Sequence, residues 1–215
     1  MKNDALERAL TLSSNLEAFT ESRDLYILFI DLCDSTSFKQ YCLEQKMPES
    51  VWIQRQMIFL SRAAYFVQRY SGTIIKTIGD ELLATFDMTI DPLDIVNCCA
   101  ESSNSFSNLR MYNKGKFRIT TRSSIDFGEC YNGQIIQPSI FDPIGTCVDR
   151  CARINKKIDP EHIGLSDDFH AVLLQRHPDI SFGSSSERIE ELRGLGQVVY
   201  FSIELSKKEN EQSIK

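Results

Sequence analysis

The run Leu25–Leu32 (LYILFIDL) constrains the fold more than any other segment of the chain. Its residues are apolar and β-prone, apart from the single acid Asp31. A nearly continuous apolar run of this length is typical of a strand that is buried on both faces, in the middle of a sheet. Asp31 lies at the end of this strand, where a buried carboxylate is costly unless it is paired or binds a metal ion.

The rest of the chain alternates helical patterns with short β-prone runs. The expected helices are Pro48–Tyr70, Asp91–Met111, Gly145–Lys156 and Ser166–Gln175, with prolines in two first turns and Ser166 as an N-cap. The expected strands are Leu25–Leu32, Thr73–Lys76, Glu81–Phe86, Phe117–Phe127, Ile163–Leu165 and Gln197–Glu204, with Glu129–Ile136 pairing with Phe117–Phe127. This order predicts an α+β sandwich in which helices cover a mixed sheet.

Length and composition narrow the class of protein. The 215 residues fit one folded domain over 23–205, after an amphipathic N-terminal helix (1–22, with its apolar pattern over Asn3–Phe19) and before a charged tail (206–215) that we expect to be disordered. The net charge of −6 argues against nucleic-acid binding. Seven cysteines without a CxxC pair or a secretory leader predict reduced thiols and a cytoplasmic protein. No apolar run is long enough for membrane insertion, and the three histidines lack zinc-ligand spacing.

Two acids stand at strand ends. Asp31 ends the buried strand, and Asp80 lies in the Thr77–Asp80 connection between two short strands. If these strands are neighbours, the two carboxylates meet at one edge of the sheet and suit Mg²⁺ or Mn²⁺. Taken singly, each could simply cap a helix or fill a turn. The next segment, Cys33–Thr36, opens a helix whose N–H groups would face phosphates, although it has no Walker or dinucleotide glycine pattern.

Four further charged residues lie in the C-terminal half of the chain. Asp149 and Arg153 are four residues apart and share a face of the expected helix Gly145–Lys156, either as a functional pair or as a solvated ion pair. Arg150 lies outside that pair and is expected to face solvent. Arg193 precedes Gly194-Leu195-Gly196, ahead of the last strand, where a surface turn is the simplest interpretation.

Four segments together resemble the class III nucleotidyl cyclase catalytic domain. They are Phe29–Thr36 (FIDLCDST), Lys76–Asp80 (KTIGD), Asp142–Arg153 (DPIGTCVDRCAR) and Arg193 before Gly-x-Gly. Three positions depart from the family's usual residues: Asp34 replaces Gly, Asp149 replaces Asn, and Arg193 replaces Lys. The resemblance runs from about Tyr26 to Ser202, so it implies that the domain 23–205 is the catalytic domain. The fold that it implies is the family's ferredoxin-like palm with a mixed, mainly antiparallel sheet.

The resemblance also implies a mechanism and a homodimer. Two divalent metal ions (Mn²⁺ or Mg²⁺) would activate the ribose 3′-hydroxyl and bridge the triphosphate of a nucleoside triphosphate, releasing pyrophosphate. The residues that the resemblance assigns are Asp31, Asp80 and the Leu32 carbonyl for the metals, Thr36 near the phosphates, Arg153 for the α-phosphate, Asp149 for the ribose and Arg193 for the terminal phosphates. In the family the metal acids come from one subunit and Lys76, Asp142, Asp149, Arg153 and Arg193 from the other.

Lys76 and Asp142 occupy the positions that read the base in the family's adenylate cyclases. A donor beside an acceptor suits adenine, cytosine or uracil and disfavours guanine. The run Val148–Ile154 (VDRCARI) and the stand-alone length look like the Pycsar branch, bacterial pyrimidine cyclases of antiphage defence. That resemblance implies cyclic UMP or cyclic CMP, which activates a separate effector without direct contact. Two alternatives stay open: an adenylate cyclase that makes cyclic AMP, and a nucleotide-binding module without turnover.

Overall fold

The computed structural model describes residues 22–109, 111–112, 115–133 and 141–205. The strands are β1 (Ser22–Leu32), β2 (Thr73–Ile78), β3 (Glu81–Asp87), β4 (Thr121–Asn132), β5 (Pro143–Ile144), β6 (His162–Ser166), β7 (Ser185–Leu192) and β8 (Gly196–Glu204). The α-helices are α2 (Ser35–Glu44), α3 (Ser50–Arg69), α4 (Pro92–Ser105), α5 (Thr146–Asn155) and α6 (Asp167–Arg176), and two 3₁₀ turns cover Phe106–Asn108 and Gly115–Phe117.

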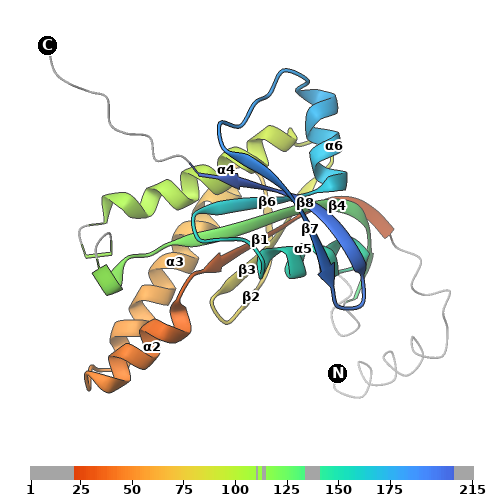
Figure 1. Cartoon of the computed structure of the whole chain (residues 1–215). Helices are drawn as coiled ribbons and strands as arrows, with labels where there is room; N and C mark the ends of the chain where they lie inside the picture. Colours follow the sequence, from red (N-terminus) through yellow and green to blue (C-terminus); the bar gives the residue numbers. More distant parts are fainter. Residues whose placement is uncertain (1–21, 110, 113–114, 134–140, 206–215) are drawn as a thin grey trace, which may run out of the picture.

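All eight strands of this part of the chain belong to one twisted sheet (Figure 1). Their order is β2-β3-β1-β4-β6-β8-β7, and the short β5 pairs with the end of β4. Neighbouring strands are antiparallel except β4 and β6, which run parallel. The sheet is therefore mixed and mostly antiparallel, and the predicted α+β class is confirmed.

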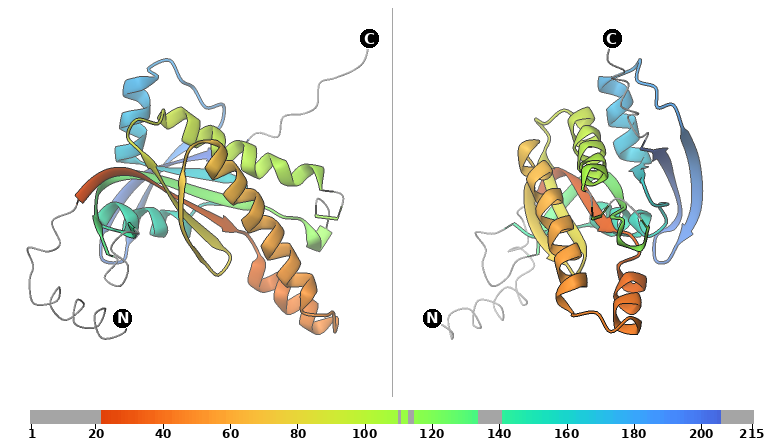
Figure 2. Two further views of the ribbon diagram at one scale, coloured as in Figure 1. Left: turned by 180° about the vertical axis from the view of Figure 1, so that it is seen from behind. Right: turned by 90° about the vertical axis from the view of Figure 1, so that its left-hand side faces the viewer.

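The buried strand β1 lies between β3 and β4, as its apolar sequence predicts. Its side chains alternate between the two faces of the sheet. Tyr26, Leu28 and Ile30 belong to the larger core, which also includes residues of α3, α4 and α6, whereas Ile27 and Phe29 pack in a second cluster that includes residues of α5. Figure 2 shows the same two layers, with α4 and α6 on one side of the sheet and α5 on the other. Asp31 follows this alternation onto the side of α5.

Several predicted elements are confirmed with shifted bounds. The expected helix Pro48–Tyr70 is α3, and Gly145–Lys156 is α5. Ser166 caps α6 by accepting a hydrogen bond from the N–H of Phe169 at 3.1 Å. The expected helix Asp91–Met111 is shorter than predicted, since α4 ends at Ser105 and a 3₁₀ turn follows.

The predicted pairing of Phe117–Phe127 with Glu129–Ile136 is wrong. Residues 129–132 continue β4, and residues 129–131 pair with β1, with Tyr131 opposite Ser22. Phe117 instead ends a 3₁₀ turn. The strand β7 was not predicted, because its sequence (SSERIEEL) is polar and almost wholly exposed at the edge of the sheet.

The predicted N-terminal helix and C-terminal tail lie outside the described residues. Within the described ranges, no helix has both the length and the apolar character that crossing a membrane requires.

Candidate active site

Asp31 is held at the end of β1 by two basic side chains. Arg122 stands opposite it on β4 and donates from Nε and a terminal nitrogen to Asp31 Oδ2, at 2.9 and 2.6 Å. The ammonium group of Lys156, in the last turn region of α5, lies 3.9 Å from the same oxygen and 3.2 Å from Glu81. Asp31 is only 4% exposed, so this pairing offsets the cost of burying its charge.

Asp80 lies in the tight turn between β2 and β3, next to the end of β1. The register of β1 and β3 places Asp31 opposite Glu81, and the N–H of Leu32 donates to the Asp80 carbonyl at 3.2 Å. The two acids that the sequence singled out therefore lie at neighbouring strand ends. A positive φ of 65° at Gly79 forms the turn that presents Asp80.

This edge of the sheet fits divalent cations in the chemistry of its donors. Asp31 and Asp80 each accept their hydrogen bonds through Oδ2, so Oδ1 is the oxygen that each offers to a cation. The described residues contain no cluster of three or more His, Cys, Asp or Glu side chains arranged for a metal ion. Coordination would thus need main-chain carbonyls, water and substrate phosphates, which is how Mg²⁺ usually binds.

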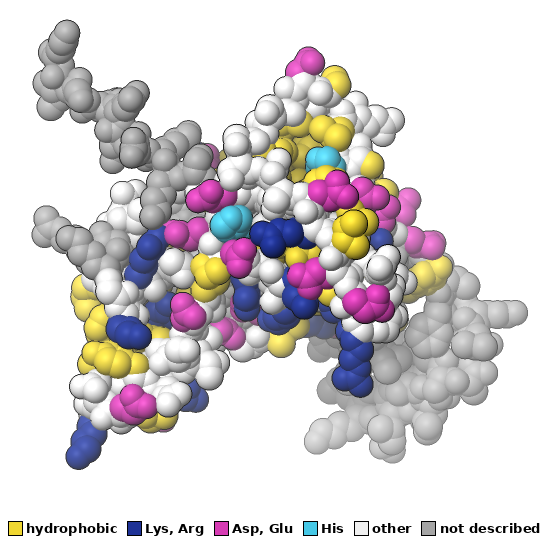
Figure 3. All heavy atoms as spheres, viewed as in Figure 1, with side chains coloured by type: hydrophobic (Ala, Val, Ile, Leu, Met, Phe, Trp, Pro, Cys, Tyr) yellow, Lys and Arg dark blue, Asp and Glu magenta, His cyan; other side chains and the backbone are white. Residues whose placement is uncertain are grey.

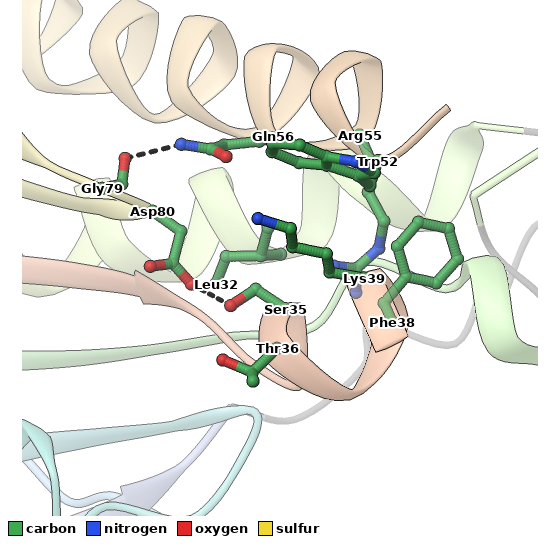
Figure 4. Close-up of a pocket in the computed structure, with 10 residues that line it drawn as sticks. All are labelled: Leu32, Ser35, Thr36, Phe38, Lys39, Trp52, Arg55, Gln56, Gly79 and Asp80. Atoms are coloured by element: carbon green, nitrogen blue, oxygen red, sulfur yellow. Dashed lines mark hydrogen bonds between the residues drawn. The ribbon is translucent and has the colours of Figure 1, made fainter. Parts of the chain in front are cut away.

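A pocket of about 300 Å³ opens between Asp80 and the start of α2 (Figure 4). Ser35 and Thr36 lie in the first turn of α2, and the Ser35 hydroxyl donates to Asp80 Oδ2. Leu32 lines the same pocket. Lys39 extends into it below the ring of Trp52, with its ammonium group 4.4 Å from the ring centroid. A helix N-terminus with two hydroxyls and a lysine is suited to bind anionic groups.

Lys76 and Asp142 contact each other directly. The Lys76 ammonium group lies 2.8 Å from both carboxylate oxygens of Asp142. Lys76 comes from the edge strand β2 and Asp142 from the segment just before β5. The structure thus brings together the predicted base-reading pair within one chain.

Asp149, Arg153 and Arg193 line one open pocket of about 540 Å³. The first two lie on α5, and Arg193 lies in the tight β7–β8 turn. A guanidinium nitrogen of Arg153 lies 4.0 Å from the position of a Cβ on Gly194 in that turn. No ion pair joins Asp149 to Arg153 in the described part of the chain, so the simple i, i+4 ion pair is wrong. The pocket can bind an anion between two guanidinium groups.

Sequence reasoning missed three residues around Asp31. Arg122 and Lys156 are the basic residues that hold its carboxylate, and Glu81 is the acid beside it. Arg122 can be identified as a partner of Asp31 only once the register of β1 with β4 is known. Glu81 is 8% exposed; burial raises its pKa, and the nearby ammonium group of Lys156 opposes that rise. Lys156 also lines the Arg153 pocket, so it touches both groups of site residues. Figure 3 shows basic side chains gathered around α5, with acidic ones between them.

Lys156→Met should strengthen the binding of Mn²⁺ to the Asp31 edge by about 3- to 10-fold. An ammonium group and a divalent cation 4 Å apart repel each other by about 2 kcal/mol in water, and salt and the half-exposed position of Lys156 reduce this to roughly 1 kcal/mol. Direct titration of Mn²⁺ by calorimetry measures the change. Lys157→Met is the matched control, because Lys157 pairs with Glu190 at 2.6 Å and should leave the affinity unchanged. Weaker binding in Lys156→Met would contradict this assignment.

A family model described as the adenylate and guanylate cyclase catalytic domain matches residues 18–205. A search of curated protein sequences gives no match. The structure is similar to the guanylyl cyclase Cya2 (20% identity, TM-score 0.71, covering 88% of this chain and 96% of that one). It is also similar to the adenylyl cyclase CyaB from P. aeruginosa (17%, 0.68, 87% and 97%) and to a non-canonical dimeric guanylyl cyclase domain of the RhoGC fusion protein from Blastocladiella emersonii (12%, 0.63, 86% and 98%).

Proposed function

Because the chain belongs to the adenylate and guanylate cyclase catalytic-domain family, we propose that it is a nucleotidyl cyclase. It would convert a nucleoside triphosphate into a 3′,5′-cyclic monophosphate and pyrophosphate. The observation that carries the proposal is the arrangement of two residue groups: acids at one sheet edge beside a helix N-terminus, and an arginine pocket beside α5. The first group suits metal-bound phosphates, and the second suits the charge that develops during phosphoryl transfer.

Asp31, Asp80 and the Leu32 carbonyl would hold two divalent metal ions. When bound, such ions supply the charge that activates the ribose 3′-hydroxyl and holds the triphosphate. Arg122 keeps the Asp31 carboxylate in place, and Ser35 does the same for Asp80. Thr36 and the first N–H groups of α2 would orient the phosphates.

The arginine pocket would act on the reacting phosphate. Arg153 would donate hydrogen bonds to the α-phosphate as its negative charge grows, and Arg193 would bind the terminal phosphates. Asp149 lies on the same pocket wall and would accept a hydrogen bond from a ribose hydroxyl. Since the family resemblance assigns the acids and the arginines of one site to different subunits, we propose a homodimer with two equivalent sites.

The Lys76–Asp142 pair supports adenine or a pyrimidine over guanine. An ammonium donor beside a carboxylate acceptor matches a ring acceptor beside an amino donor, or a carbonyl beside a ring N–H. Guanine shares the second pattern with uracil, so the preference against guanine rests on the resemblance of these two positions to those of adenylate cyclases. Our preferred substrate is UTP or CTP, and the support for it is the Asp149 segment and its resemblance to the Pycsar enzymes. Cyclic UMP or cyclic CMP would then signal to a separate effector in antiphage defence. An adenylate cyclase is the alternative that the same pair supports.

Incubation of the purified protein with Mn²⁺ and all four nucleoside triphosphates should give cyclic UMP or cyclic CMP as the main product. Mass spectrometry of the products identifies the base. Lys76→Ala and Asp142→Ala should reduce the preference among bases. Each variant removes a donor or an acceptor and leaves the matching group of the preferred base without a hydrogen bond. Cyclic AMP as the sole product would instead establish the adenylate alternative. Triphosphate binding without any cyclic product would favour a nucleotide-binding module.

A further inference from the structure

Two cysteine sulfurs touch where strand β4 meets the start of helix α5. Cys130 Sγ and Cys147 Sγ are 3.3 Å apart. Cys130 is the antepenultimate residue of β4, and Cys147 is the second residue of α5. Both are buried, with Cys130 at 0% and Cys147 at 4% exposure. The mechanism proposed above uses neither thiol.

The contact follows from close backbone packing at this junction. The end of β4 pairs with β5, and Gly145 directly follows β5. A Cβ on Gly145 would lie 2.8 Å from the Glu129 carbonyl oxygen, and one on Gly128 would lie 3.0 Å from the Cβ of Cys147. Glycine at these two positions therefore lets the helix start approach the strand closely enough for the thiols to meet.

The surroundings give the two thiols different roles. The hydrogen-bonded contact with Cys130 and the N–H of Val148 in the first turn of α5 lower the pKa of Cys147. The same contact and burial raise the pKa of Cys130. Cys147 is thus the more readily ionised thiol of the pair, and its place at a helix N-terminus also favours a thiolate.

We infer that Cys130 and Cys147 form a peroxide-responsive thiol pair, whose disulfide joins β4 to α5 and lowers the rate of cyclisation. The Cys147 thiolate attacks a peroxide oxygen, which breaks the O–O bond and, after protonation, releases one water and leaves a sulfenic acid. The Cys130 sulfur then attacks the Cys147 sulfur, forms the S–S bond and releases a second water. In total two thiols are oxidised, one hydrogen peroxide is reduced, and two waters form.

The disulfide would disturb the site residues on both sides of Cys147. An S–S bond is about 2.05 Å long, so the two sulfurs must approach by more than 1 Å from their present 3.3 Å. Asp142 lies before Cys147 in the chain, and Asp149 lies two residues after it on the same helix. Displacement by about 1 Å of positioning groups can cost roughly 10²-fold in rate. We expect oxidation to reduce turnover at least about 10-fold, a consequence that rests on the proposed cyclase function.

The chemical step is tested without any assay of activity. The reduced full-length protein is treated with hydrogen peroxide, and the intact mass and the proteolytic peptides are measured. A loss of two hydrogen masses and a Cys130–Cys147 linked peptide are expected, both reversed by dithiothreitol. Cys147→Ser and Cys130→Ser should abolish the linked peptide. Cys98→Ser, buried in α4 on the other face, is the matched control and should still form it. Oxidation of other cysteines with no Cys130–Cys147 link would overturn the inference.

Measurements of cyclase activity then distinguish a failure of this inference from a failure of the proposed function. Wild type and Cys98→Ser should lose activity with peroxide and regain it with dithiothreitol, whereas Cys147→Ser should keep its activity. Thermal melting confirms that each variant is folded, and Cys147→Ala replaces the serine variant if that one unfolds. A linked peptide with unchanged turnover would overturn the regulatory effect. If reduced wild type makes no cyclic product at all, the proposed function fails, and the peptide measurement still decides the thiol chemistry.

Discussion

Asp31→Asn should reduce the rate of cyclic nucleotide formation by roughly 10³-fold. The amide keeps a hydrogen-bond acceptor for Arg122 but loses the negative charge that binds a divalent cation. Metal ions contribute several kcal/mol to stabilising transition-state charge, and each 1.4 kcal/mol corresponds to about 10-fold in rate. The measurement is the initial rate of product formation at saturating Mn²⁺. Asp24→Asn is the matched control on the exposed start of the same strand and should behave like wild type.

The same variant also tests whether the sites are shared between subunits. Arg153→Ala should be inactive as well, because the guanidinium group is lost from the α-phosphate. After subunit exchange in an equal mixture with Asp31→Asn, half of the dimers would be mixed, and each of these would have one intact site. About a quarter of wild-type activity should therefore return. Complete subunit exchange without any recovery of activity would contradict the shared site.

Arg150→Met should lower the free energy of unfolding by about 3–5 kcal/mol, because it leaves a buried charge without its partner. Arg150 donates two hydrogen bonds to Asp126, at 2.7 and 2.8 Å, and also contacts Asp168. Asp126 has no exposed surface. Urea denaturation followed by circular dichroism measures the loss. Arg188→Met is the control, since Arg188 is exposed and lies 3.8 Å from Asp159.

The loss in Arg150→Met should depend on pH in a defined direction. Burial raises the pKa of Asp126, and the hydrogen bonds and charge of Arg150 oppose that rise. Without Arg150 the folded-state pKa is raised further above the unfolded value, so the folded protein binds the proton more tightly. The destabilisation should be complete above the folded pKa and should shrink as the pH falls through it. Adding Asp126→Asn should also recover part of the stability at neutral pH. An equal loss at all pH values would argue against a buried charge as the cause.

The centre of the sheet was predictable because its sequence signal is local. The apolar run of β1 directly predicts a buried strand, and the residues between β2 and β3 directly predict a tight turn. The predicted break after Phe127 was wrong, because β4 continues through Gly128, whose missing side chain makes room for Cys147. The edge strand β7 has no apolar face to bury, so no periodic pattern could reveal it.

The candidate site divides in the same way. The neighbouring positions of Asp31 and Asp80 were predictable from their places at strand ends, and the turn that holds Arg193 from the glycines that follow it. Arg122 and Lys156 required the register of β1 with β4 and the position of α5. Arg150 was expected to face solvent, yet it binds the buried Asp126, because a helix pattern alone does not show which strand residue lies beneath it.

The central position of β1 also has a consequence for synthesis on the ribosome. One neighbour of β1, β3, follows within the next 55 residues or so, but the other is β4, which ends at Asn132. At about 5–20 residues per second, the hundred residues after Leu32 take roughly 5–20 seconds to make. During that time β1 lacks its partner β4. The nascent chain therefore exposes an unpaired, aggregation-prone strand edge until Asn132 has been translated.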